Sequence, residues 1–138
     1  MYRLIHFIFY LISLLPFRAL YLLSDGLYVV LFHMVGYRRK EVEKNLRMAF
    51  ADKTDNDRLL IEHKFYHWLC DYFVESIKLL SISKEELQRR FTIANSDEVE
   101  KCFEEGQSAA AVLGHYCNWE WLSCVGIDLP ANRVMGLV

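Results

Sequence analysis

His115 and Glu120 form the pair in this sequence whose types and spacing best suit acid–base chemistry. One imidazole nitrogen can take a proton from a hydroxyl group while the other donates a hydrogen bond to a carboxylate that holds the ring in place. On one continuous helix, positions five apart point about 140° away from each other, so the two side chains could not meet. We therefore expect His115 on a turn and Glu120 in the first turn of the helix that follows.

The chain just before this pair predicts how it is positioned. Ala109–Leu113 is a short apolar run, typical of a strand buried on both faces, and Gly114 ends it. In open α/β sheets, active sites lie just beyond the carboxyl ends of strands, which is where His115 would lie. Backbone amides at the start of the next helix could hold a developing oxyanion. A structural role is the alternative, because His-x4-Glu spacings are common by chance and a histidine at a strand end is about as often a cap as a base.

The run GHYCNWEW, at residues 114–121, is more specific than the spacing alone. It resembles the GH-(F/Y)-x-NWE signature of the lauroyl and myristoyl acyltransferases of lipid A biosynthesis, which are membrane-bound relatives of the H-x4-D glycerolipid acyltransferases. The resemblance continues upstream through RRKEVEKNLRMAF to nearly the start of the chain, so it covers almost the whole sequence. One departure follows Phe50, where the family usually carries a proline and this chain has Ala51.

The resemblance implies that a fatty acyl group passes from an acyl-carrier-protein thioester to a hydroxyl of a lipid A precursor. It makes His115 the general base and Glu120 the carboxylate that orients the ring and stabilises the imidazolium. Asn118 and Trp119 are then expected to bind substrate, with Asn118 holding either the oxyanion or the turn itself. A covalent acyl-enzyme on Cys117 is the alternative, but the family varies at this position, so direct attack by the acceptor is favoured. No metal or cofactor is expected.

Charge is distributed unevenly along the chain and predicts a membrane partner. Residues 1–50 carry seven Lys or Arg against three Asp or Glu, whereas residues 51–138 carry nine against fifteen. A basic and apolar front end suits an anionic membrane surface, and the lack of a basic stripe further along argues against nucleic acid. The four cysteines include no C-x-x-C pair, which suits free thiols in a reducing cytosol.

Two apolar runs make residues 1–36 a predicted membrane anchor. The first run, residues 4–15, is too short to cross a bilayer, and the second, Ala19–Val35, is interrupted by Ser24-Asp25-Gly26. Either a proline-kinked helix over about residues 2–23 spans the membrane once, which we favour, or both runs lie at the interface as a bent amphipathic anchor. The basic cluster after the anchor places the rest of the chain on the cytoplasmic side of the inner membrane.

Residues 37–82 are predicted to form a basic amphipathic helix followed by a long helix over about Arg58–Leu80. Apolar residues recur every three or four positions along the long helix, as in a helix packed on one face. His63, His67 and Cys70 have a spacing on it that could bind zinc. No fourth ligand is evident, so a polar helix face is the better interpretation.

Residues 83–138 are predicted to be the N-terminal part of an α/β acyltransferase domain. A short helix over about 83–90 comes first. Three strands, at Phe91–Ala94, Ala109–Leu113 and Val134–Val138, then alternate with two helices, over about 95–105 and 118–125. This βαβαβ order requires a mostly parallel sheet. Because the sequence ends within the last strand, we expect a truncated chain that is inactive alone. The alternatives are a non-catalytic membrane-anchored fragment and an acyltransferase for another membrane lipid, such as an aminolipid or glycolipid.

Overall fold

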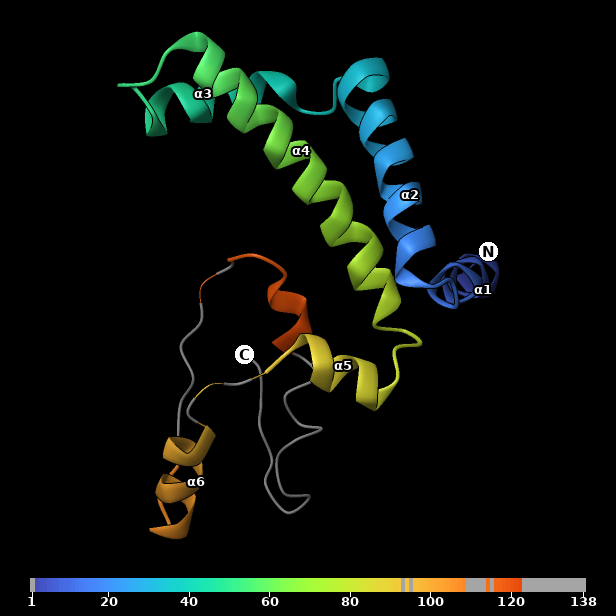
Figure 1. Cartoon of the computed structure of the whole chain (residues 1–138), viewed down its shortest axis with the longest axis vertical. Helices are drawn as coiled ribbons and strands as arrows, with labels where there is room; N and C mark the ends of the chain where they lie inside the picture. The colour runs from blue at the N-terminus through green and yellow to red at the C-terminus, as the bar shows by residue number, and fades with distance from the viewer. Residues whose placement is uncertain (1, 93, 95, 109–113, 115, 123–138) are drawn as a thin grey trace. The chain divides into compact units, whose positions relative to one another are not determined.

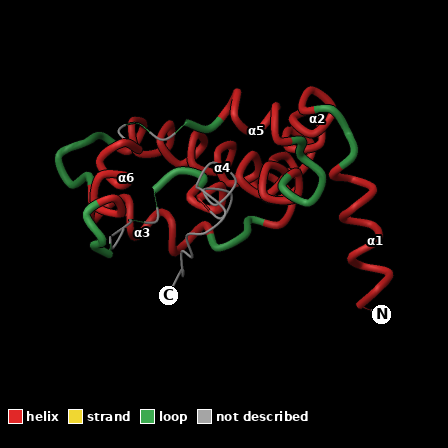
Figure 2. Tube along the Cα trace, turned by 90° about the horizontal axis from the view of Figure 1, so that it is seen from below, coloured by secondary structure: helices red, strands yellow, loops and turns green. Residues whose placement is uncertain are grey.

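The computed structural model describes residues 2–92, 94, 96–108, 114 and 116–122. The chain divides into two compact units, Met1–Ser81 and Ile82–Val138. Within the described residues, every regular element is a helix (Figure 1). Figure 2, which colours the trace by secondary structure, shows the same helices joined by short loops.

The predicted fold class, α/β with the start of a parallel βαβαβ domain, is wrong for the described part of the chain. Of the strand expected at Phe91–Ala94, the first two residues have no regular structure and Ala94 lies in a turn. The other two expected strands, at 109–113 and 134–138, lie outside the described residues. A helix satisfies its backbone hydrogen bonds within its own segment, whereas a parallel strand needs a neighbouring strand for them. A short apolar run therefore indicates a strand only where a partner strand is in place.

The apolar N-terminal region forms two helices separated at Pro16. α1 covers Tyr2–Ser13, and α2 covers Phe17–Tyr28 and continues as a π-helix, η1, over Val29–Val35. Pro16 directly precedes α2, where its fixed φ suits a helix start and its missing N–H has no helical partner to lose. Instead of the proline-kinked helix expected over about residues 2–23, the structure has two helices with Pro16 between them.

Phe17–Val35 is the one helix in the described residues that is long and apolar enough to cross a membrane. It has 19 residues and lies near the N-terminus. Length and composition are weak evidence of a span, because a buried core helix or a signal sequence passes the same test. Whether this helix can cross a membrane therefore depends on its contacts with the rest of the protein.

Two further helices complete the first unit. α3 covers Arg39–Ala49 and α4 covers Asp55–Lys78, so the long predicted helix is confirmed. Thr54 and Asp57 form a reciprocal capping box at the start of α4: Thr54 Oγ1 accepts from the Asp57 N–H at 3.2 Å, and the Asp57 carboxylate accepts from the Thr54 N–H at 3.3 Å. The N-cap of α4 is thus Thr54.

The core of the first unit lies where α2 and η1 pack antiparallel to α4. Tyr28 and Phe32 meet Tyr66 and Cys70 of α4, and all four side chains are buried. The Tyr66 hydroxyl donates to the backbone carbonyl of Tyr37, just after η1. Burial raises the pKa of the Tyr66 phenol, so it remains a donor under all ordinary conditions.

The carbonyl groups at the end of α1 accept hydrogen bonds from the C-terminal end of α4 and the residues just after it. Lys78 Nζ donates to the Ser13 carbonyl at 2.8 Å and to the Leu15 carbonyl at 2.9 Å. The Ser81 hydroxyl donates to the same Ser13 carbonyl at 2.6 Å. The end of α1 is thereby satisfied by side chains of α4 and the residues after it, as a helix end without intrahelical partners requires.

One buried carboxylate ties α3 to α4. Glu62 is 5% exposed and accepts a hydrogen bond from Arg39 Nε at 3.0 Å. The guanidinium of Arg39 also lies over the Phe32 ring, with 4.3 Å between Cζ and the ring centroid. The hydrogen bond to Glu62 raises the pKa of Arg39, so the guanidinium stays charged. The Arg39 side chain therefore connects η1, α3 and α4.

The described residues of the second unit include two short α-helices, both predicted from the sequence. α5 covers Lys84–Arg90, and the Ser83 hydroxyl accepts the Glu86 N–H at 3.2 Å. α6 covers Ser96–Glu104. Gly106 follows two residues later, and its left-handed φ of 71° turns the chain away from the helix. Leu87 and Trp121 are the buried apolar side chains among the described residues of this unit.

Replacing Glu62 with alanine should lower the free energy of unfolding by about 1–2 kcal/mol, because it removes the partner of a partly buried guanidinium. The expected loss is below that of a fully buried pair, since the Arg39 side chain is 42% exposed and water can hydrate it. Urea unfolding in mild detergent, followed by circular dichroism, measures the change.

Glu43→Ala is the matched control. It removes an exposed carboxylate that pairs with Arg47 at 2.9 Å, one helical turn away, and should cost much less than Glu62→Ala because water screens the exposed pair. Equal losses for the two variants would show that the burial of Glu62 contributes nothing.

Candidate functional site

The described part of segment 114–122 is a tight turn followed by a short 3₁₀ helix. The Tyr116 N–H donates to the Gly114 carbonyl at 2.8 Å, and Cys117 follows with a left-handed φ of 53°. Residues 119–122 form the 3₁₀ helix, and the Trp121 N–H closes its first turn on the Asn118 carbonyl at 3.3 Å. The left-handed residue changes the chain direction in one step, so a helix can begin directly after the turn.

The structure places three of the four predicted site residues on this turn. Trp119 and Glu120 lie half-buried in the first turn of the 3₁₀ helix, and Asn118 is half-buried just before it. Trp121, in contrast, is 7% exposed and belongs to the interior of its unit. His115 lies outside the described residues, so its contact with Glu120 stays a prediction. The helix expected over about 118–125 is described as far as Leu122.

α2 and α4 meet along a row of polar contacts that we call the polar seam. We did not expect it from the sequence, although its α2 members recur at helical spacing within an otherwise apolar run. A hydroxyl from α2 contacts an acidic or imidazole side chain of α4 at each step. The three hydrogen bonds join Tyr21 to Glu75 at 2.9 Å, Ser24 to Asp71 at 2.6 Å and Tyr28 to His63 at 2.6 Å.

The residues with zinc-like spacing on α4 belong to this seam and to the core. His63 Nδ1 contacts the Tyr28 hydroxyl, and the His67 ring stacks on the Tyr28 ring with centroids 3.6 Å apart. Cys70 is fully buried in the core, and burial raises the pKa of its thiol. In the described residues, no three His, Cys, Asp or Glu side chains come close enough to hold a metal ion.

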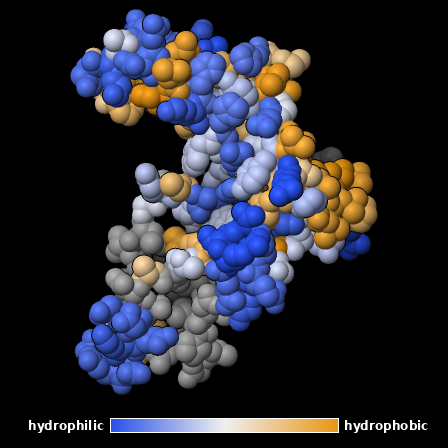
Figure 3. Space-filling model, viewed as in Figure 1, coloured by the Kyte–Doolittle hydropathy of each residue, from blue (hydrophilic) through white to orange (hydrophobic). Residues whose placement is uncertain are grey.

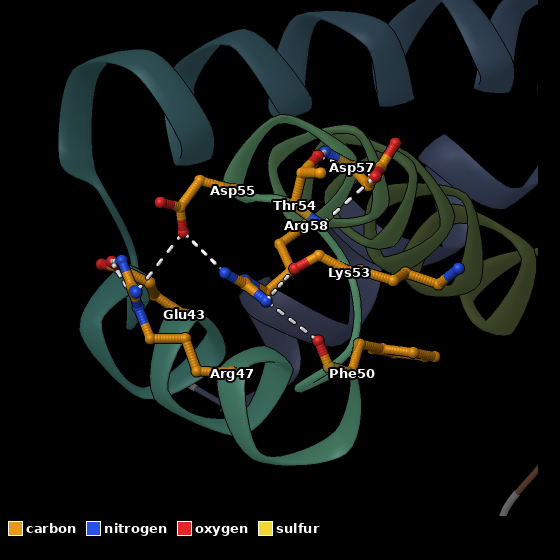
Figure 4. Close-up of polar contacts among 8 residues, drawn as sticks. All are labelled: Glu43, Arg47, Phe50, Lys53, Thr54, Asp55, Asp57 and Arg58. Atoms are coloured by element: carbon orange, nitrogen blue, oxygen red, sulfur yellow. Dashed lines mark hydrogen bonds and ion pairs between the residues drawn. The ribbon is translucent and has the colours of Figure 1, made fainter.

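Arg47 and Arg58 organise the corner between α3 and α4 (Figure 4). The Asp55 carboxylate lies between them, 2.8 Å from Arg58 Nη2 and 3.4 Å from Arg47 Nη1. The hydrogen bond from Arg58, with the charge of Arg47 beside it, lowers the pKa of Asp55. Arg58 Nη1 also donates to the Phe50 carbonyl at 3.0 Å, which satisfies the end of α3. The corner therefore has a structural role.

An open cavity of about 270 Å³ lies against this corner, between α3 and α4. Its charged side chains are paired within its walls, Arg39 with Glu62 and Arg47 with Glu43. α3 ends at Ala49 beside it without the proline that the family usually carries. We assign no chemistry to the cavity.

The family model for bacterial lipid A biosynthesis acyltransferases matches residues 2–127 of this chain. The chain belongs to that family. The resemblance seen in GHYCNWEW and RRKEVEKNLRMAF is thereby confirmed. A comparison with curated proteins found no match, and a comparison with solved structures found none either.

Membership of the lipid A acyltransferase family supports an acyltransferase of the lipid A biosynthesis type, with an acyl donor and a lipid acceptor. The match includes both the polar seam and the turn that carries Glu120. Within the described residues, the turn at 116–122 is the part of the candidate active site that the structure shows. The seam and the α3–α4 corner shape the helical unit that precedes it.

Cys117→Gly should leave the second unit folded and raise its stability by up to about 1 kcal/mol, because a left-handed residue with a Cβ carries a cost of that order. Cys117→Val should lower stability by a similar amount, since a β-branched side chain tolerates this conformation least. Thermal unfolding followed by tryptophan fluorescence compares the two. A valine variant as stable as the glycine variant would contradict a left-handed turn at this position.

Proposed function

We propose that this protein transfers a fatty acyl group from an acyl-carrier-protein thioester to a hydroxyl of a lipid A precursor, with His115 as general base and Glu120 as its orienting partner. The observation that carries the proposal is the family match over residues 2–127, which includes the GHYCNWEW run. The position of Glu120, half-buried in the first helical turn after a left-handed residue, supports it. A carboxylate there suits a hydrogen bond to an imidazole on the preceding turn.

The reaction needs one proton to move twice. His115 takes the proton from the acceptor hydroxyl as its oxygen attacks the thioester carbonyl carbon, and a tetrahedral oxyanion forms. The carbon–sulfur bond then breaks, the imidazolium returns the proton to the leaving thiolate, and the ester remains on the lipid. Glu120 holds the ring in the correct tautomer and stabilises the imidazolium between the two steps.

Asn118 and Trp119 lie beside Glu120 and are assigned to substrate. An amide side chain can donate to the developing oxyanion, and an indole offers an apolar surface to an acyl chain. Cys117 is exposed, and the direct route gives it no covalent role. Attack by the acceptor itself is preferred, since it requires no acyl-enzyme on a residue that varies within the family.

The same proposal places the protein at the cytoplasmic face of the inner membrane. The supporting observations are the apolar α1, α2 and η1 and the excess of basic residues over residues 1–50. Basic residues beside an apolar anchor favour the cytoplasmic side. Acyl-carrier-protein is a soluble donor, so a cytoplasmic site would give it access to a lipid acceptor at the surface.

His115→Ala should abolish acyl transfer with little loss of folding, because a turn residue makes few core contacts. Glu120→Ala should lower kcat by about 10²–10⁴-fold with KM nearly unchanged, as expected when a base loses its orienting partner. Transfer of radiolabelled acyl groups from acyl-carrier-protein to lipid A precursor measures both.

Glu104→Ala, an exposed glutamate at the end of α6, is the control and should retain full activity. Cys117→Ser should also stay active. Near-normal turnover by His115→Ala would remove the mechanism, and an inactive Cys117→Ser enzyme with intact fold would establish the covalent route instead.

A further inference from the structure

The outward sides of α1, α2 and η1 carry exposed apolar side chains that we call the apolar face. It includes Leu4, Phe7 and Leu11 of α1, and Leu22, Val30 and Met34 further along. Leu22 is 72% and Met34 75% exposed, far more than an interior residue. Figure 3 shows the apolar patch over α1. A surface of this kind marks an interaction with another apolar phase.

The polarity of α2 is the reverse of that of a soluble amphipathic helix. Its hydroxyl groups at Tyr21, Ser24 and Tyr28 point inward, to acidic and imidazole groups of α4. Leu22 and Leu23 of the same helix are 72% and 45% exposed, whereas Leu20 is buried with the hydroxyl groups. The helix therefore takes its polar partners from α4 and leaves its apolar side for an outside medium.

This pairing excludes a simple span by Phe17–Val35. α4 lies antiparallel along that helix, so any crossing would carry the matching stretch of α4 into the hydrocarbon region as well. That stretch holds charged side chains at Glu62, Lys64 and Asp71, and more at its end. Charged side chains at the centre of a bilayer are costly, by at least about 2.5 kcal/mol each. Breaking the seam instead would leave Ser24 and Tyr28 without their hydrogen-bond partners.

α1 is also too short to cross. Its 12 residues extend about 18 Å at 1.5 Å per residue, against a hydrocarbon core of about 30 Å. It is mostly apolar, and its last carbonyl groups accept hydrogen bonds from Lys78 at the end of α4 and from Ser81 just after it. Its length fits a helix within one leaflet.

Basic side chains accompany the apolar face. Arg3 and Arg18 are exposed on α1 and α2, and Arg38 and Lys40 are exposed directly after η1. One such charge near an anionic surface contributes about 1 kcal/mol to binding. The charge pattern therefore selects an anionic bilayer as the medium that covers the apolar face.

We propose that α1, α2 and η1 dock in the plane of an anionic bilayer, with the apolar face dipped into one leaflet and the polar seam and α4 on the water side. The binding mode of these helices is monotopic: none of α1, α2 and η1 crosses the membrane. This inference rests on the proposed function only in placing the protein at a membrane; it does not depend on the chemistry of His115.

Depth measurements distinguish docking in the plane from crossing. Gly26→Cys and Met34→Cys place single thiols eight residues apart on the exposed side of this helix, and an added Cβ at Gly26 meets no neighbour. The background carries serine at Cys102, Cys117 and Cys124 and retains the buried Cys70. The thiols carry an environment-sensitive fluorophore, and spin-labelled lipids quench it in phosphatidylethanolamine–phosphatidylglycerol vesicles.

Docking in the plane predicts the same shallow depth for both labels, whereas a span predicts depths that differ by about 12 Å, from 1.5 Å per residue. A label at Lys64→Cys, an exposed position on α4, should remain in water. Depths that differ by the full amount, or a Lys64 label in the hydrocarbon region, would overturn the inference and leave the membrane location intact. A wild-type chain that binds no vesicle would overturn both.

A second arm tests the charge contribution. Arg18→Glu with Lys40→Glu should weaken binding to the anionic vesicles by about tenfold or more, and should leave binding to phosphatidylcholine vesicles unchanged. Lys64→Glu reverses one charge on α4, half the change of the double variant, and should have little effect. Equal losses from the double variant and from Lys64→Glu would show that the charges beside the apolar face have no special role.

Discussion

The first unit depends on the polar seam, because the seam decides which side of the apolar N-terminal helix faces the protein. Hydroxyl groups of α2 bind partners on α4 about once per helical turn. α2 therefore cannot rotate without losing several hydrogen bonds together. Once the polar side is fixed inward, the apolar side must face outward. Burial inside the protein and exposure are thereby assigned to opposite sides of one helix.

Local signals in the sequence predicted the helices well. Thr54, Ser83 and Gly106 each bring their own hydrogen bonds or backbone conformation, so the helix ends they mark do not depend on distant parts of the chain. The strands failed for the opposite reason. A parallel strand at Phe91–Ala94 would need partners elsewhere in the chain, and the described part of that segment has no regular structure.

In the candidate site, too, features set by nearby residues were predictable and features that need distant partners were not. The position of Glu120 in the first turn of a helix follows from residues within a few places of it, and the structure has it there. The family was recognisable from GHYCNWEW because several unusual residue types occur at fixed spacing. The seam was missed because an isolated serine or tyrosine in an apolar run does not say which partner it will find. Only the contact with Asp71 or His63 gives Ser24 and Tyr28 their role.

The π-helix η1 makes the length of this region more constrained than its composition. A π-helix accommodates an additional residue relative to an α-helix of the same extent. Across it, Phe32 stacks on Tyr28 and receives Arg39 over its ring, while Arg39 reaches Glu62. Deleting one residue from Val29–Val35 would turn everything downstream by about 100° and carry Arg39 away from Glu62. Exchange of one exposed aliphatic side chain for another in η1 should therefore be tolerated, whereas a single-residue insertion or deletion there should break the contacts of Arg39.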